Sequence, residues 1–363
     1  MKRLVFSVTN DLSCDQRMQR ICGSLAANGF DVLLVGRKLK TSISLHKKKF
    51  NQKRIHCFFT HGFLFYAEYN FQLFFFLLFV KADLFCAIDL DTILPVYFAS
   101  ALRNKKRVYD AHELFTEQKE IVTKPKLHRF WMWIEKIFVP KFKQGYTVNN
   151  FIKDELKRRH SVYYSTVKNL PIPQPLALQK AKERFIIYQG AVNEGRSFET
   201  LIPAMRSVHT KLKIYGNGNF FKQVQELIKK YNVEDKVELM GHLLPTELNK
   251  ITPTAYLAVM LFEETGLNQY YSLSNRFFDY IMACVPQLCV NYPEYKAVND
   301  VYNIACMIDD VWPQTIAAAL NRLLTDVPLH EQLHQNCVIA NKVMNWENEE
   351  ITLIAFYNTL HIK

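Results

Sequence analysis

The strongest constraint on the fold is a repeated alternation of short apolar runs with helical segments. In the first half, continuous apolar runs at 3–9, 31–36 and 82–89 are separated by stretches with helical periodicity. Strands that are apolar at every position are typical of a parallel sheet covered by helices on both faces. The same pattern starts again at 185–190 and continues to 305–308. We therefore predict two α/β units, each a doubly wound parallel sheet.

One segment interrupts this alternation. Residues 169–182 read NLPIPQPLALQKAK, with three prolines within five residues. A chain of 363 residues is long enough for two domains of about 150 residues each. The sequence thus predicts an N-terminal domain at 1–170, a linker at 171–183 and a C-terminal domain at 184–344. Because ligands of such sheets bind beyond the carboxyl ends of the strands, we expect the two domains to face a cleft.

The composition is that of an ordinary folded protein. Hydrophobic residues make up 49% and charged residues 22%, which excludes long disordered stretches. The eight cysteines are scattered without a CxxC pair, as expected for reduced thiols in a cytosolic protein. We expect no secretory signal, because the first apolar run breaks at Asn10 and Asp11.

The net charge of +12 indicates an anionic partner. Basic residues cluster at 47–54, 105–107 and 136–143, and the third cluster lies next to Phe130, Trp131 and Trp133, which we expect to be exposed. Basic residues beside aromatic ones favour an anionic membrane surface, and no nucleic-acid motif is recognisable. A solvated basic face is the alternative.

The stretch 63–80, FLFYAEYNFQLFFFLLFV, is a further candidate for membrane contact. It carries Glu68, Asn70 and Gln72, and its uninterrupted apolar part is only 73–80. A spanning helix needs about 20 predominantly apolar residues. We therefore favour an apolar amphipathic helix, packed inside or partly dipped into a bilayer surface, over a membrane span. The expected location is cytoplasmic and peripheral, at the inner face of the plasma membrane.

A polar loop that turns into a helix occupies residues 268–286. Ser274 or Asn275 can act as N-cap. The helix N-terminus then offers backbone N–H groups and a positive dipole end, which suit a phosphate, and Arg276 would add a formal charge. Asp279 lies within one turn, where a carboxylate could accept hydroxyl bonds, as from a ribose. An ordinary capped helix is the alternative interpretation.

Other strand ends of the second half carry compatible residues. Gly190 ends the first strand, and Arg196 follows in a loop, where a guanidinium could bind a diphosphate with two hydrogen bonds. Gly216 and Gly218 permit close approach of a ligand, although alone they indicate a plain turn rather than a site. Together with the loop before Asp279, these residues predict a site for a nucleotide diphosphate.

Acidic residues mark two strand ends of the first half. Asp89 and Asp91 follow one apolar run; Asp110, His112 and Glu113 follow the next. A lone histidine is usually structural, but one flanked by two carboxylates at a strand end favours a functional role. The spacing matches no known metal loop. Neither a GxSxG elbow nor a GxxxxGK[ST] phosphate loop occurs.

Five segments resemble motifs of one enzyme family over essentially the whole chain. They are VYDAHE (108–113), YQGAVNEGRSFETLI (188–202), LKIYGNG (212–218), VELMGHL (237–243) and GLNQYYSLSNRFFDYIMACVP (266–286). The sequence resembles the retaining glycosyltransferases of family 4. This resemblance implies the GT-B fold, in which two Rossmann-like domains face a cleft. It also implies that the last helix, here at 345–363, packs back on the N-terminal domain.

The resemblance also implies site residues. It gives His112 contact with the donor sugar, with Asp110 and Glu113 beside it. It places the donor diphosphate at Gly190, Arg196, Ser274, Asn275 and Arg276. It places the ribose and sugar at Asp279, Tyr271, Glu264 and Asn268. It places the base near Gly216, Gly218, Gly241 and His242, and the acceptor at Asn10, Asp11, Asp89 and Asp91. The donor is a nucleotide-diphosphate sugar, and neither a metal nor another cofactor is needed.

Four positions depart from the family pattern. The family often has two Glu eight positions apart, where this chain has Tyr271 and Asp279. Cys284 replaces a usual Gly, and Ser274 stands where close relatives tend to have Pro. The function expected from the resemblance is retaining transfer of a sugar to a cell-surface glycan or lipid-linked acceptor at the cytoplasmic membrane face. The alternatives are a non-catalytic nucleotide- or glycan-binding partner and a GT-B-fold sugar-nucleotide epimerase. The sequence does not predict the oligomeric state.

Overall fold

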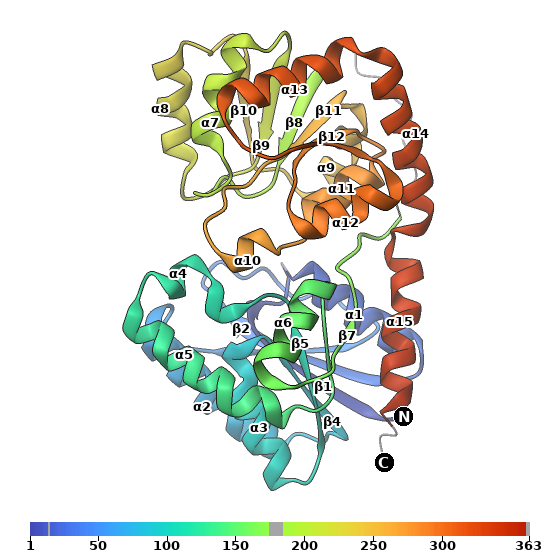
Figure 1. The fold of residues 1–363 in the computed structure, drawn as a ribbon. Coiled ribbons are helices and arrows are strands. Elements are labelled where there is room, and N and C mark those ends of the chain that lie inside the picture. The colour runs from blue at the N-terminus through green and yellow to red at the C-terminus, as the bar shows by residue number, and fades with distance from the viewer. Residues whose placement is uncertain (14, 174–183, 361–363) are drawn as a thin grey trace. The chain divides into compact units, whose positions relative to one another are not determined.

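The computed structural model describes residues 1–13, 15–173 and 184–360. The chain forms two compact units, of which the first joins Met1–Asn169 to Glu349–Lys363 and the second is Leu170–Asn348. Each unit has one parallel sheet with helices against it (Figure 1), so the predicted α/β class with two doubly wound sheets is confirmed. Residues 174–183 of the predicted linker lie outside the described residues.

The sheet of the first unit has seven strands in the order β3-β2-β1-β4-β5-β6-β7. The strands are β1 (Arg3–Asp11), β2 (Asp31–Lys38), β3 (Asn51–His56), β4 (Leu84–Ile88), β5 (Lys106–Ala111), β6 (Gly145–Thr147) and β7 (Ser165–Thr166). All pairs are parallel, and Val5 of β1 pairs with Leu33 of β2 on one side and Phe85 of β4 on the other. The order reverses between β1 and β4, which is where ligands of such sheets bind.

Helices cover both faces of this sheet. They are α1 (Gln16–Ala27), α2 (Gly62–Phe79), α3 (Ile93–Leu102), α4 (Lys119–Val122), α5 (Pro125–Phe138) and α6 (Asn150–His160), with short 3₁₀ turns at Leu90–Thr92, Phe115–Glu117 and Val139–Lys141. Helices α2, α3, α5 and α6 share one apolar core against the sheet. Helix α1 and the second part of α15 (Trp346–Thr359) cover the other face (Figure 1).

The last turns of α15 complete the core of the first unit. Tyr357 is buried, and its ring centroid lies 6.0 Å from that of Phe6 and 6.2 Å from that of Tyr146. Its hydroxyl donates to Cys86 Sγ at 3.7 Å. The helix therefore begins in the second unit and ends as a structural part of the first.

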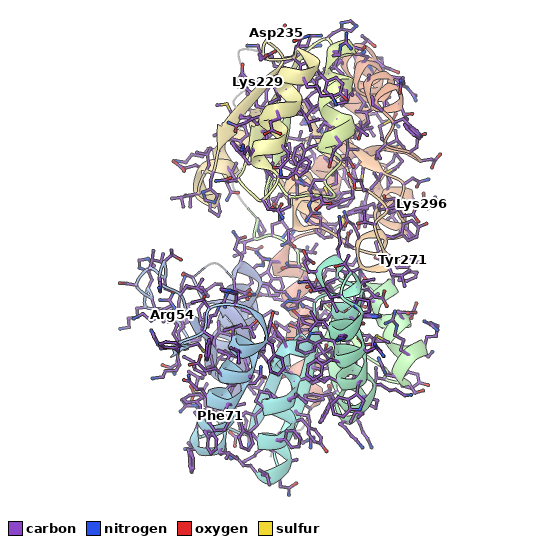
Figure 2. All side chains as sticks on the ribbon, turned by 90° about the vertical axis from the view of Figure 1, so that its left-hand side faces the viewer. Arg54, Phe71, Lys229, Asp235, Tyr271 and Lys296 are labelled. Carbon is purple, nitrogen blue, oxygen red and sulfur yellow. The ribbon has the colours of Figure 1, made fainter. Side chains whose placement is uncertain are left out.

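Helix α2 buries only one side. Phe65, Tyr69, Leu73 and Leu77, spaced four residues apart, lie in the core, and the Tyr69 hydroxyl donates to the Val8 carbonyl. The opposite side carries exposed aromatic side chains, of which Phe71 is labelled in Figure 2. Among the described helices, α2 is the one long and apolar enough to cross a membrane by length and composition. Its buried face makes it a layer helix of the first unit.

The sheet of the second unit has six parallel strands in the order β10-β9-β8-β11-β12-β13. They are β8 (Phe185–Gln189), β9 (Lys211–Tyr215), β10 (Val237–Gly241), β11 (Leu257–Met260), β12 (Gln287–Val290) and β13 (Ala305–Ile308). The order reverses between β8 and β11, so the loops that follow these two strands frame the expected ligand position.

The helices of the second unit are α7 (Phe198–Ala204), α8 (Phe221–Tyr231), α9 (Pro245–Ile251), α10 (Leu267–Tyr270), α11 (Asn275–Met282), α12 (Pro293–Tyr302), α13 (Pro313–Thr325) and α14 (Val327–Val343). Short 3₁₀ turns occur at Met205–Ser207 and Thr252–Thr254. The chain leaves helical geometry between α14 and α15, so the last helix begins at Trp346, one residue after the predicted start at 345. Helix α12 was missed because only Tyr295 and Val298 of its ten residues are buried.

Candidate active site

His112 lies directly after β5, between two carboxylates of the first unit. Its backbone N–H donates to Asp89 Oδ1 at 2.8 Å. Its ring nitrogen Nδ1 lies 3.3 Å from Asp89 Oδ2, and Nε2 lies 3.2 Å from Asp110 Oδ2. The imidazole orientation is therefore fixed by both neighbouring strand ends, β4 and β5.

Arg17 of α1 forms a buried ion pair with Asp110. Its Nη2 lies 3.0 Å from Asp110 Oδ1, and the two side chains are 4% and 0% exposed. A second guanidinium nitrogen donates to the Val167 carbonyl at 3.2 Å. Burial would raise the pKa of Asp110, but the charges of Arg17 and His112 outweigh it, so the pKa is lowered. Asp110 is thus an ionised carboxylate inside the unit.

Arg17 was missed by the sequence reasoning. The signal was present, because Arg17 lies one turn before Ile21 on the apolar face of the first predicted helix. A single charge on a buried face calls for a buried partner of opposite sign.

These neighbours set the charge of His112. Burial alone would lower the pKa of the imidazole, but the negative charges of Asp89 and Asp110 outweigh it and raise the pKa. The raised pKa favours the protonated imidazole at neutral pH, with both ring nitrogens directed at carboxyl groups. Burial also raises the pKa of Asp89, to about 8. A sugar hydroxyl that bonds to this ring must share a nitrogen with Asp89 or Asp110.

The two aspartates after β4 are unusual in different ways. Asp89 has φ of +56°, which side-chain-bearing residues seldom adopt. Such backbone strain clusters at functional sites. Asp91 is buried and accepts a hydrogen bond from the Thr9 hydroxyl. Burial and the charge of Glu113 raise the pKa of Asp91 to about 6 despite the Thr9 bond.

The remaining first-unit candidates have partners of their own. Asp11 forms an ion pair with Arg54, whose Nη2 lies 2.6 Å away and which is labelled in Figure 2. Burial would raise the pKa of Asp11, but hydrogen bonds from Ser13 and other donors lower it to about 2. Asn10 donates to Asp15 at 3.4 Å. Glu113 accepts from the Gln118 side chain.

In the second unit, tightly packed loops follow β8 and β9. A Cβ on Gly216 would lie 1.8 Å from the Gly190 carbonyl oxygen, and one on Gly218 would lie 2.3 Å from Asn193 Oδ1. Gly190 has φ of +117°. These glycines are therefore required for the packing of the two loops against each other.

The loop after β10 joins the same assembly. The carbonyl of Gly241 accepts from the Gly216 N–H at 2.8 Å. Gly241 itself has φ of +73°, and His242 next to it is exposed. The four residues predicted to surround the base thus lie along one edge of the sheet, at the carboxyl ends of β9 and β10.

Arg196 lies over an aromatic ring at the point where the strand order reverses. Its Cζ is 4.3 Å from the ring centroid of Phe262, which follows β11. The two loops are joined because the Gly195 carbonyl accepts from the Glu263 N–H at 3.2 Å and from Gln269 Nε2 at 2.7 Å. Phe262, which the sequence reasoning did not identify, holds the guanidinium by a cation–π contact.

The start of α11 differs from the expectation in two respects. Ser274 is the N-cap residue, but its side chain makes no capping bond, and its backbone N–H donates to the Tyr295 hydroxyl at 3.1 Å. Arg276 is buried; its Nη1 donates to the Gln189 carbonyl at 3.3 Å, and its Cζ lies 4.2 Å from the Tyr188 ring centroid. Both groups have partners inside the unit, and the predicted contribution of the Arg276 charge to a diphosphate site stays a prediction.

Asp279, further along α11, is half-buried. It accepts from Gln189 Nε2 at 3.3 Å, and Gln189 Oε1 in turn accepts from the Thr252 hydroxyl at 2.5 Å. This chain links Asp279 to the end of β8, beside the loop that carries Arg196. The carboxylate is thus held in one orientation at the carboxyl edge of the sheet.

The other predicted donor residues line the loop before α11. Glu264 and Asn275 are exposed, and Asn268 is half-buried. The ring of Tyr271, labelled in Figure 2, packs against Tyr270 with centroids 4.8 Å apart. After the helix, Cys284 has φ of +57°, a left-handed conformation that favours glycine at a helix C-terminus.

Within the part of the chain that the structure describes, no three His, Cys, Asp or Glu side chains come together as a metal site. The Asp89, Asp91 and His112 cluster is held by hydrogen bonds and charge pairs instead. That the reaction needs no metal stays a prediction.

Comparisons with known proteins bear on the fold and on the second unit. Residues 175–337 match the family model described as glycosyl transferases group 1. A search of curated proteins by sequence gives no match.

Several solved structures are similar over the whole chain. Sucrose-phosphate synthase from Thermosynechococcus elongatus has a TM-score of 0.81 at 15% identity, covering 99% of both chains. A glycosyltransferase from Rickettsia africae has a TM-score of 0.75 at 12% identity, covering 100% of this chain and 99% of that one. Anabaena HepE in complex with UDP-glucose has a TM-score of 0.73 at 10% identity, covering 99% of this chain and 100% of that one.

These likenesses establish the fold as GT-B, with two Rossmann-like units of parallel sheet. The family model matches the residues that follow β8, β9, β10 and β11, where Arg196 and Asp279 lie. Residues 175–337 match the glycosyl transferases group 1 model, and the chain is a glycosyltransferase.

Proposed function

We propose that this chain transfers a sugar from a uridine-diphosphate sugar to an acceptor, with retention of the anomeric configuration. HepE of Anabaena binds UDP-glucose, and the pneumococcal transferase GtfA has been solved with UDP and GlcNAc. Both share this fold, with TM-scores of 0.73 and 0.60. The family model adds the enzyme class.

The observation that carries the proposal is the position of Arg196. Its guanidinium is held on Phe262, between the loops after β8 and β11, where the strand order of the second sheet reverses. Ligands of doubly wound sheets bind at this point. A guanidinium binds a diphosphate with paired hydrogen bonds, and it can stabilise the charge that grows on the leaving nucleotide.

Asp279 suits the ribose of the same donor. Its carboxylate is fixed by Gln189 and remains half-buried at the sheet edge. An ionised carboxylate accepts hydrogen bonds from two neighbouring hydroxyls, as a ribose offers. With Arg196 on the diphosphate, the proposed nucleotide lies along the carboxyl edge of β8, β9 and β10.

The cluster around His112 suits the transferred sugar. Two carboxylates and a cationic imidazole, oriented by Arg17, form a rigid polar surface at the corresponding edge of the first sheet. Such a surface can hold sugar hydroxyls in one orientation without reorganising during the reaction. We assign no nucleophile, and we propose that the transfer proceeds without a metal.

For the acceptor we propose a cell-surface glycan or lipid-linked sugar at the cytoplasmic face of a membrane. The support is the exposed apolar side of α2, where Phe63, Phe71 and Phe79 are 68%, 65% and 84% exposed. The basic residues of the first unit add attraction to anionic lipids. Pelleting with anionic liposomes tests this part. Release by salt is expected, and indifference to lipid charge contradicts it.

The donor part is tested by thermal shift with UDP, GDP, ADP, CMP and their common sugar conjugates. A ligand at 100 times its Kd adds about 2.7 kcal/mol of stability, which is a rise of several degrees in Tm. We expect the uridine compounds to stabilise the wild type and an Arg206→Ala control, whose guanidinium-bearing residue is exposed in the same unit. Arg196→Ala should abolish the shift.

No response of the folded wild type to any nucleotide would overturn the proposal. Binding of UDP without consumption of any UDP-sugar, in the presence of membrane extracts, would favour a non-catalytic binding partner. Release of a free or converted sugar without acceptor would favour an epimerase.

A further inference from the structure

A second concave site lies entirely within the first unit. It is a pocket of about 450 Å³ between α2, α5 and the loops after β4 and β5. That volume is within the range of about 300–1,000 Å³ typical of small-molecule sites. The pocket opens to solvent, because Phe63, Ala67 and Phe130 at its rim are exposed.

The walls of this pocket are aromatic and aliphatic. Trp131 of α5 is the central side chain; its ring centroid lies 4.9 Å from that of Phe115 and 5.8 Å from that of Tyr66. Leu127 and Ile134, one turn away on either side along α5, continue the same wall. Such a lining favours hydrocarbon and gives a sugar ring few hydrogen bonds.

The polar residues of the lining are Asn70, Asp91, Gln118, Glu120 and Lys124. At the inner end the pocket is lined by Asp91 and Gln118. Asp91 lies near Glu113 and His112, and Gln118 contacts Glu113. Asp91 is 8% exposed, and the Gln118 side chain donates to Glu113. At the outer end Phe63 of α2 and Phe130 of α5 face each other with centroids 6.3 Å apart.

The outer end continues into an apolar surface. Beyond Phe63 and Phe130, the side chains of Phe71 on α2 and Trp133 on α5 are 65% and 56% exposed. A ligand that matches the acidic inner end and the apolar rim has a polar head with hydroxyl donors at one end and a hydrocarbon chain at the other. The chain would leave the pocket where the protein surface is itself apolar.

We propose that this pocket binds the single hydrocarbon chain of an amphiphilic acceptor, with a hydroxyl of its head at Asp91. The inference rests on the proposed transferase function and specifies its acceptor as a lipid rather than a soluble glycan. Asp91 accepts the hydroxyl bond, and the neighbouring His112 cluster holds the sugar to be transferred. The wall around Trp131 selects for the chain.

The test uses the full chain and n-alkyl β-D-glucosides of increasing length, each below its critical micelle concentration. Isothermal titration measures affinity. Each methylene that enters the pocket should raise affinity about fourfold, until the chain reaches the rim and the gain stops. Affinity that does not depend on chain length overturns the proposal.

Intrinsic fluorescence locates the bound chain. Trp131 is 6% exposed and lines the pocket, whereas Trp133 on the same helix is 56% exposed and does not. Binding should change the emission of the wild type and of Trp133→Phe, and Trp131→Phe should lose the change. If Trp133→Phe loses the change and Trp131→Phe keeps it, the chain lies on the outer surface and the proposal is contradicted.

A matched pair on α5 tests occupancy. Leu127→Phe fills part of the pocket and should weaken glucoside binding about tenfold, which corresponds to the loss of nearly two methylenes. Ile137→Phe adds a ring on the same helix outside the pocket lining and should leave the affinity unchanged. Equal effects of the two substitutions contradict a specific pocket.

A change of head group separates an acceptor from a bilayer lipid. Alkyl dimethylamine oxides have the same chain, and their heads accept hydrogen bonds but donate none. We expect glucosides to bind more tightly than amine oxides of equal length, and Asp91→Asn to reduce that difference. Equal affinity of the two heads in wild type and variant overturns the acceptor assignment.

A UDP titration of each sample separates this inference from the proposed function. Arg196 and Asp279 belong to the second unit, so a folded Leu127→Phe chain should still bind UDP. UDP binding without chain-length dependence overturns only the lipid pocket. Chain-length dependence without UDP binding overturns only the proposed donor.

Discussion

The buried ion pair between Arg17 and Asp110 offers the sharpest stability test in the first unit. Their side chains are 4% and 0% exposed, and their charged atoms are 3.0 Å apart. Arg17→Met keeps much of the side-chain volume but leaves Asp110 without its guanidinium. Removing one partner of a buried pair costs about 3–5 kcal/mol, because the remaining charge stays buried.

His112, the remaining partner of Asp110, sets where the loss of stability of Arg17→Met should fall between about 3 and 5 kcal/mol. Its ring still faces Asp110 at 3.2 Å after the substitution and partly balances the carboxylate. We therefore expect the lower end, about 3 kcal/mol. For a unit of this size that corresponds to a fall in Tm of about 6–12 °C, measured by calorimetry.

Two further variants make the reasoning refutable. Arg158→Met removes a guanidinium that is 71% exposed in its pair with Glu155, so it should cost at most about 1 kcal/mol. Arg17→Met combined with Asp110→Asn removes the stranded charge and should be more stable than Arg17→Met alone. If Arg17→Met costs no more than Arg158→Met, or the double variant shows no recovery, the buried charge is not what Arg17 stabilises.

Three other predictions follow from the described contacts. The folded-state pKa of His112, raised to about 9, lies above the unfolded value of about 6.5. The stabilisation is complete below pH 6.5 and lost as the pH rises through 9. Urea titrations should show a smaller decline for His112→Gln, in which Asp89, whose pKa is raised by burial, still contributes. Ser161, exposed with φ of +54° at the end of α6, should gain up to about 1 kcal/mol as Ser161→Gly but nothing as Ser161→Ala; no difference in Tm between the two refutes strain there. Phe262→Leu should weaken UDP-sugar binding about tenfold or less by removing the ring on which the Arg196 guanidinium lies, and unchanged affinity in a titration would contradict the role of the ring.

The two parallel sheets could be predicted because their strands are apolar at nearly every position. Runs such as 185–190 and 305–308 differ from the polar segments around them whatever the tertiary structure. Helix α6 (Asn150–His160) likewise begins at a local signal, because the Asn149 side chain caps it by accepting from the Ile152 N–H. Local sequence therefore determined most elements of both units.

The site depends on pairings between residues far apart in sequence. Arg17 and Asp110 are 93 positions apart, and the donor to the Tyr295 hydroxyl is 21 positions away at Ser274. Nothing local to Arg276 shows that its guanidinium lies over Tyr188 instead of facing solvent. Positions of charges at the strand ends could be predicted from sequence, but the partner of each charge depends on how the helices pack.

The path of α15 has a consequence for how the protein is made. Tyr357 fills the face of the first sheet beside Phe6, Cys86 and Tyr146, yet residues 170–348 precede it in the chain. At 5–20 residues per second, the ribosome needs about 10–40 s to synthesise that interval. During this time the first unit exposes an apolar face that only the later helix covers, while the second unit already has its own core residues. We expect the nascent first unit to be a chaperone client until α15 has emerged.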